Sequence, residues 1–190
     1  SVRYKDTLVV AYRDRTDEEI RDINIARKAG DIWEKPYRVH NDNWKIAGCP
    51  VNGPMLAIQK GKIAIAWYTG AKNSARVNVA FSKDIGRTFS EPIRIDLSMP
   101  LGRVDLEWIN NDEVIVSWIE SGDETSNIYA RRVNINTRLS KETLVEKIPP
   151  GRISGYPQME VVNNNVLFAW TEINKKTIVA SKWLSLSALK

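Results

Sequence analysis

Short apolar segments that end in an aromatic residue recur along this chain. They are Leu8–Tyr12, Ile63–Trp67, Val114–Trp118 and Val166–Trp170, and their last residues are separated by roughly fifty positions. Each segment is rich in β-branched residues and is followed by a polar stretch. That pattern predicts buried strands rather than helices.

Other segments of strand character surround each of these. A second set follows them directly, at Asp22–Ala26, Val77–Phe81, Asn127–Arg131 and Thr177–Ser181. A third set precedes them, at Pro54–Ile58, Val104–Ile109 and Pro157–Val162, and a fourth closes the repeats, at Tyr37–His40, Ile93–Asp96 and Thr143–Ile148. The first repeat shows no obvious inner strand before Leu8, and the last has only Leu184–Leu189 as a candidate outer strand.

Four antiparallel strands in every repeat predict an all-β fold, a β-propeller built of four-stranded antiparallel blades. We expect one partial propeller domain over residues 1–190, with repeats at approximately 1–52, 53–103, 104–156 and 157–190, or about three and a half blades. An eight-stranded lipocalin-like barrel is the structural alternative, but nothing in a barrel requires a repeat of this length.

The composition fits a globular chain, with 43% hydrophobic and 27% charged residues. Lys and Arg number 28 against 23 Asp and Glu, and they alternate with acids, so we expect a mixed surface and no nucleic-acid partner. No apolar run is long enough for a membrane span and no signal peptide is evident, which suggests a soluble, mature or trimmed chain. Cys49 is the only cysteine, which excludes an internal disulfide.

A turn motif in the second repeat carries the most specific signal. Ser82, Asp84, Gly86, Thr88 and Phe89 follow the spacing Ser-x-Asp-x-Gly-x-Thr-Phe. Such a turn needs a carboxylate to accept backbone N–H groups, a glycine that adopts positive φ, and an aromatic anchor. The motif resembles the Asp box of sialidases and related propellers, and its role is structural. Gly30 and Trp33 repeat the separation of its glycine and aromatic one repeat earlier.

The chain as a whole resembles the C-terminal portion of bacterial exo-α-sialidase-like proteins with BNR or Asp-box repeats. The stretches Tyr12–Arg15, Gly48–Pro54 and Leu101–Asp105 contribute to this resemblance. It implies a six-bladed ring, a glycan or glycoconjugate ligand and a periplasmic or extracellular location. Because an open arc of blades leaves sheet edges uncovered, we expect a missing segment, another chain or self-assembly to supply the missing blades.

The resemblance also implies an active site at the axial loops, on the face opposite the Asp-box turn. There an arginine cluster holds the sugar carboxylate, a Tyr activated by a Glu is the nucleophile, and an Asp is the acid/base. The candidates are Tyr156, Glu172 and Asp14 for catalysis, and Arg13, Arg15, Trp44, Asn52, Arg103 and Arg152 for substrate binding.

Each candidate has a structural alternative. Arg13 and Arg15 can belong to a salt-bridged loop, Arg103 can pair with Asp105 or Glu107, and Tyr156 and Trp44 can serve packing alone. His40 is the single histidine and has no paired cysteine, so we expect no metal site and no cofactor. Two functions remain open: hydrolysis of a terminal acidic sugar, and non-catalytic binding of a glycan or protein, including a scaffolding role.

Overall fold

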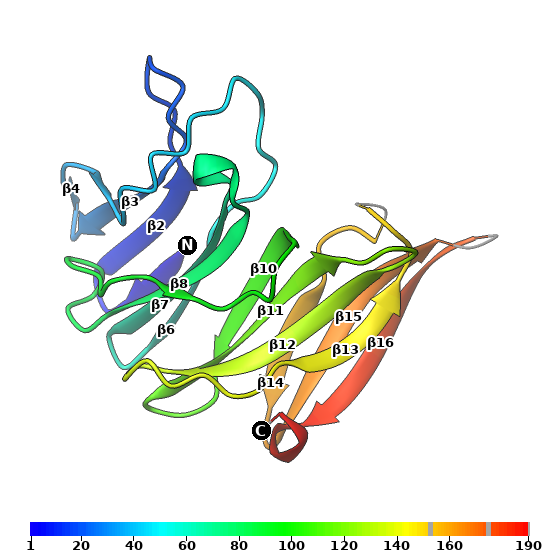
Figure 1. Cartoon of the computed structure of the whole chain (residues 1–190). Coiled ribbons are helices and arrows are strands. Elements are labelled where there is room, and N and C mark those ends of the chain that lie inside the picture. The colour runs from blue at the N-terminus through cyan, green and yellow to red at the C-terminus, as the bar shows by residue number, and fades with distance from the viewer. Residues whose placement is uncertain (152–153, 174–175, 190) are drawn as a thin grey trace.

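The computed structural model describes residues 1–151, 154–173 and 176–189. Its strands form four antiparallel sheets that follow one another in chain order. Figure 1 shows these sheets side by side in an open arc, with β2 and β16 toward its two ends. The expected all-β propeller of antiparallel blades is confirmed, and the described residues form part of such a ring.

The first sheet contains β1 (Val2–Tyr4), β2 (Thr7–Arg13), β3 (Ile23–Ala29), β4 (Ile32–Trp33) and β5 (Tyr37–Arg38). The expectation that it lacks an inner strand is wrong, because β1 pairs with β2 through Val2↔Val9 and Tyr4↔Thr7. At three residues, β1 is too short to show a clear alternating pattern. Its outer strand is β5, which pairs with β3 at Asn24↔Arg38.

The second and third sheets each have four strands in the order expected. The second contains β6 (Met55–Gln59), β7 (Lys62–Thr69), β8 (Arg76–Ser82) and β9 (Ile93–Arg94), with a 3-10 turn η1 (Ala71–Asn73) between β7 and β8. The third contains β10 (Pro100–Trp108), β11 (Glu113–Ser121), β12 (Ser126–Asn134) and β13 (Thr143–Ile148).

The fourth sheet has three strands in the described residues, β14 (Gln158–Val162), β15 (Asn165–Ile173) and β16 (Thr177–Ser185). The expected outer strand at Leu184–Leu189 is wrong. Leu184 belongs to the end of β16, and the chain then enters the 3-10 turn η2 (Leu186–Ala188). Leu189 is fully buried in the hydrophobic core, so this apolar run fills the core instead of forming a strand.

The core lies between successive sheets and is centred on the aromatic residues that mark the repeat. Trp67, Trp118 and Phe168 are fully buried. Phe81 of the second sheet meets Trp108 of the third with ring centroids 5.9 Å apart. Strand β10 lies against both β6 and β14, which places the first strands of these sheets next to one another along the inside of the arc.

The Ser82–Phe89 turn connects β8 to β9. The carboxylate of Asp84 accepts from the backbone N–H groups of Arg87 and Thr88 at 3.0 and 2.9 Å, and Gly86 has a φ of +72°. The Tyr37 hydroxyl donates to the carbonyl of Gly86 and fastens the turn to the first sheet. Trp33, at the matching position of the first repeat, is 53% exposed and anchors no such turn.

Candidate functional site

The inner strands define where a site can be built. Ser82 pairs with Ile63 at one end of the β7–β8 ladder, and Arg76 pairs with Thr69 at the other. The Ser82–Phe89 turn therefore lies at one end of this ladder, and Tyr68 lies at the other. The predicted ligand-binding side chains gather at the Tyr68 end. We define the axial site as a set of residues that lie on or beside the inner strands. It comprises Asn52, Arg103, Glu107, Tyr156 and Glu160.

The guanidinium of Arg13 joins the first two sheets. It donates to the carbonyl oxygens of Asn52, Arg21 and Tyr68 at 2.9, 2.5 and 2.7 Å. It also lies over the ring of Trp44, 4.8 Å from the centroid. Burial lowers the pKa of Arg13 to about 10. Through these contacts Arg13 positions the surrounding backbone segments.

Trp44 is enclosed by protein. Its side chain is 8% exposed, with Arg13 over the ring and Tyr68 against it at 5.5 Å in an edge-to-face arrangement. A Cβ added at Gly70 would meet the indole at 3.0 Å, so the backbone also approaches it closely. Little of the ring is left to stack on a sugar.

Arg15 and Asp14 lie in the loop between β2 and β3. Exposed Arg15 forms an ion pair of 2.5 Å with Glu19, which also pairs with Arg21. Asp14 accepts a hydrogen bond of 2.9 Å from the side chain of Asn24. The structure thus joins both residues to neighbours in their own sheet. Surface pairs of this kind contribute little to stability.

Asn52 connects the loop before β6 to the first part of β10. Its side chain is 4% exposed, accepts from the N–H of Arg103 and donates to the carbonyl of Leu101, both at 3.0 Å. Arg103 is held at a φ of +56° and Gly102 at +81°. A Cβ at Gly102 would lie 2.8 Å from the Asn52 side chain, so only glycine allows this close approach.

Arg103 and Tyr156 form the centre of the axial site. The Arg103 guanidinium lies 4.6 Å from the Tyr156 ring centroid and donates to the carbonyl of Gly155. The Tyr156 hydroxyl donates to the carbonyl of Val51. Both contacts fix the ring, yet Tyr156 remains 43% exposed. The result is an aromatic surface that is immobilised and open to solvent.

Carboxyl groups lie further along the same two segments of chain, on β10 and β14. Asp105 is buried and accepts from the N–H groups of Met159 and Leu106 at 2.7 and 2.9 Å. Burial, and next the charge of Glu160, raises the pKa of half-buried Glu107 to about 7. Burial likewise raises the pKa of Asp105 to about 6. Both values lie in the range where carboxyl groups exchange protons near neutral pH.

Sequence analysis missed Glu107 as a functional residue, because it considered Glu107 only as a partner for Arg103. A signal was present: Arg103, Asp105 and Glu107 alternate with apolar residues along an inner strand. Alternation places Asp105 and Glu107 on one side of β10, while Arg103 lies in an irregular part of the strand between Gly102 and Asp105. A polar side of this kind on a strand otherwise surrounded by core is a candidate functional surface.

Tyr156 and Glu172 lie in different surroundings. Tyr156 contacts Val51 and Arg103, whereas Glu172 lines a hollow of about 470 Å³ together with residues of β13 and β16 such as Glu146 and Lys182. Arg152 lies outside the described residues.

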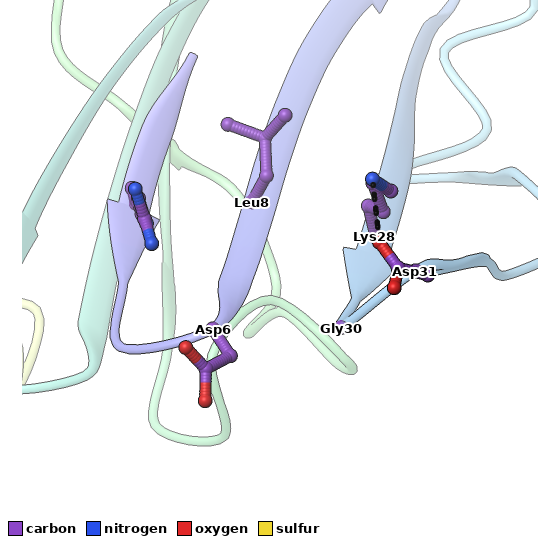
Figure 2. Close-up of a pocket in the computed structure, with 6 residues that line it drawn as sticks. Asp6, Leu8, Lys28, Gly30 and Asp31 are labelled. Atoms are coloured by element: carbon purple, nitrogen blue, oxygen red, sulfur yellow. Dashed lines mark ion pairs between the residues drawn. The ribbon is translucent and has the colours of Figure 1, made fainter.

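A second hollow, of about 490 Å³, lies at the other end of the first sheet (Figure 2). Asp6, Leu8 and Gly30 line it, and Lys28 and Asp31 form an ion pair of 3.5 Å at its side. Because it lies by the β1–β2 and β3–β4 turns, it is separate from the axial site.

In the described ranges, no group of three or more His, Cys, Asp or Glu side chains is arranged to hold a metal ion. Among the same residues, no helix is long and apolar enough to span a membrane.

Comparison of the sequence with protein-family models and with curated proteins finds no match. Solved structures do match the fold. The Hadza microbial sialidase Hz136 is 17% identical with a TM-score of 0.60, over 95% of this chain and 44% of that one. The α-L-arabinofuranosidase CtGH43 of Clostridium thermocellum ATCC 27405 is 13% identical with a TM-score of 0.53, over 96% and 66%.

The GH43 protein BlXynB of Bacillus licheniformis is 12% identical, with a TM-score of 0.52, over 95% of this chain and 38% of that one. The chain therefore spans less than two thirds of each of these structures. At such low identity the likeness establishes the propeller fold alone.

Proposed function

We propose that this chain is part of a glycan-processing propeller that binds a sugar at the axial site, with the sugar ring against Tyr156. The observation that carries this proposal is that Tyr156 is fixed by Arg103 and by the Val51 carbonyl while 43% of it stays exposed. A pocket for a small molecule typically combines such an apolar surface with a few convergent polar groups. Glu107 and Glu160 supply carboxyl groups further along the inner strands β10 and β14.

The carboxyl groups suit hydrolysis of a glycosidic bond. That reaction uses one carboxylic acid to protonate the leaving oxygen and a second carboxylate as base or nucleophile. Glu107, whose pKa is raised to about 7, retains its proton in a substantial fraction of molecules at neutral pH. We assign the proton donor to Glu107 and the second role to Glu160, which acts on Glu107 through its charge.

The sialidase-type form of the proposal concerns a terminal acidic sugar. The hydrogen bonds of Asp84 and the positive φ of Gly86 support reading Ser82–Phe89 as an Asp box. In this form Arg103 and Arg152 bind the sugar carboxylate. Asp14, Tyr156 and Glu172 keep the catalytic roles that the resemblance implies. A periplasmic or extracellular location, and completion of the ring by blades of another chain or a second copy, belong to the same proposal.

A non-catalytic glycan or protein binder is the second candidate, and the contacts of the arginines favour it. Arg13 has three carbonyl partners and Arg15 is paired with Glu19, so neither is positioned as part of a carboxylate clamp. A propeller that positions its loops in this way can present a binding surface, or serve as a scaffold, without turnover.

The test measures hydrolysis by the purified chain of α-sialosides and α-L-arabinofuranosides. In these substrates the leaving group is an unactivated sugar. A proton donor matters most for such poor leaving groups, so Glu107→Gln should lower kcat by about 10²-fold or more, while exposed Glu124→Gln should not. Saturable oligosaccharide binding without turnover would establish the second candidate. Absence of both turnover and binding would contradict the proposal.

A further inference from the structure

The fold leaves the side chain of Arg76 without a bonding partner. Among the residues that the structure describes, its guanidinium forms no hydrogen bond and no ion pair, although its Nε atom is shielded from solvent. Neighbouring arginines differ, because Arg13 donates to three carbonyl oxygens and Arg94 pairs with Asp96 at 2.7 Å. A shielded donor without a partner costs free energy, so this guanidinium is a candidate contact for a ligand.

The strand register places Arg76 on a defined face of the second sheet. Arg76 pairs with Thr69 in the β7–β8 ladder, and Asn78 pairs with Trp67 two residues further along. Residues opposite each other in a ladder point to the same face, and diagonal neighbours such as Arg76 and Trp67 have Cα atoms about 7–8 Å apart. This face packs on the first sheet, since Trp67 shares a buried cluster with Ile23 of β3.

Asp42 reaches the same face from the loop after β5. Its Oδ2 accepts from the indole N–H of Trp67 at 2.7 Å, while its Oδ1 lies 3.9 Å from Nε2 of His40, beyond hydrogen-bond distance. Burial raises the pKa of Asp42, whereas the Trp67 hydrogen bond and then the charges of His40 and Arg76 lower it. Arg76 thus acts on Asp42 through its charge without bonding to it.

We call Arg76, His40 and Asp42 the outer site. It lies between the first and second sheets, so described strands form both of its sides. The side chain of His40 is 36% exposed, which gives solutes access to the group. Arg76 offers N–H donors and Oδ1 of Asp42 offers an acceptor. A sugar hydroxyl both donates and accepts, so two adjacent hydroxyls match these atoms, whereas the charge of Asp42 opposes an anionic ligand.

Arg13 connects the outer site to the axial site. Its guanidinium donates to the carbonyl of Asn52, which belongs to the axial site, and to the carbonyl of Tyr68. Tyr68 precedes Thr69, the ladder partner of Arg76. The two sites therefore lie at the same end of the second sheet, and a glycan longer than one sugar can contact both.

We propose that the outer site binds a further sugar of the glycan whose terminal sugar lies at the axial site, with Arg76 and Asp42 holding two adjacent hydroxyl groups. This inference rests on the proposed function and adds that the preferred ligand is an oligosaccharide and not a monosaccharide. Contacts to a remote part of a substrate supply binding energy that a truncated substrate lacks.

The experiment compares monosaccharide and trisaccharide ligands by calorimetric titration of the whole chain. The probes are methyl α-L-arabinofuranoside with linear arabinotriose, and methyl α-sialoside with sialyllactose. In the pair that binds, the trisaccharide should bind at least about tenfold more tightly than the monosaccharide. Arg76→Gln should remove this gain and leave the monosaccharide affinity unchanged. Arg138→Gln, at an exposed position on the turn before β13, should change neither affinity.

Two further measurements separate lost recognition from misfolding. Arg76→Gln should leave the unfolding midpoint unchanged, because the guanidinium has no bond within the described chain to lose. Arg76→Lys keeps the charge without the planar fork and should retain only part of the gain. A trisaccharide that binds no more tightly than its monosaccharide, or a gain that survives Arg76→Gln, would overturn this inference alone. No binding of any probe would contradict the proposed function and this inference together.

Discussion

Asn52 holds Arg103 in place: its side-chain oxygen accepts a hydrogen bond of 3.0 Å from the Arg103 N–H, although Asn52 lies in the loop before β6 and Arg103 lies in β10 of the next sheet. Arg103 keeps a left-handed backbone, with a φ of +56°, that a non-glycine residue adopts at a cost. Because Arg103 in turn supports the ring of Tyr156, the amide of Asn52 determines the geometry of the axial site.

Asn52→Ala should therefore lower the free energy of unfolding by about 1–3 kcal/mol, since it leaves the buried N–H of Arg103 and carbonyl of Leu101 without this partner. Urea denaturation measures the change. Asn41→Ala is the matched control, because Asn41 is an exposed residue of a neighbouring loop. Equal stabilities of the two variants would contradict the role given to Asn52.

Asp84→Ala should destabilise the chain by about 1 kcal/mol through loss of its hydrogen bonds in the turn. Burial acts to raise the pKa of Asp84, but bonds from Thr88, Ser82 and Arg87 outweigh it and lower the pKa to about 2. The contribution is thus present above the unfolded pKa of about 3.9 and is lost as pH falls toward 2.

Unfolding of the Asp84→Ala chain should accordingly differ from wild type at neutral pH and converge with it near pH 2. Asp123→Ala, at an exposed position, provides the comparison. A difference that persists unchanged at pH 2 would show that the carboxylate is not the stabilising group.

Glu107→Gln should stabilise the chain at high pH. The pKa of Glu107 is raised to about 7 in the folded state against about 4.3 unfolded, so wild-type stability is greatest below the unfolded pKa and falls as pH rises through 7. After allowance for solvent screening we expect a gain of about 1 kcal/mol at pH 8 and none at pH 4. Thermal unfolding at both values checks this, and a variant with the wild-type pH dependence would exclude the assignment.

The spacing of Trp67, Trp118 and Trp170 was enough to predict the fold, because each repeat must bury a strand against its neighbour. The strands expected near the two ends of the chain were predicted incorrectly. The strand Val2–Tyr4 is too short to have a readable pattern, and the apolar run that ends at Leu189 fits a strand and a core plug equally well. Local pattern does not distinguish those outcomes.

The site was harder to predict for a related reason. Residue type indicated that Arg13 and Trp44 were available to a ligand, but their partners, such as Asn52 and Tyr68, come from segments far away in sequence. Conversely, the raised pKa of Glu107 depends on burial and on Glu160 of another strand. Neither effect is visible until the inner strands are placed side by side.

The most direct test of the central claim is a calorimetric titration of the chain with an oligosaccharide that it binds, compared with two variants. Tyr156→Phe keeps the ring over Arg103 and should retain most of the affinity, whereas Tyr156→Ala removes the surface for the sugar and should weaken binding about tenfold. Wild-type affinity in Tyr156→Ala would contradict the proposal that the sugar lies at the axial site.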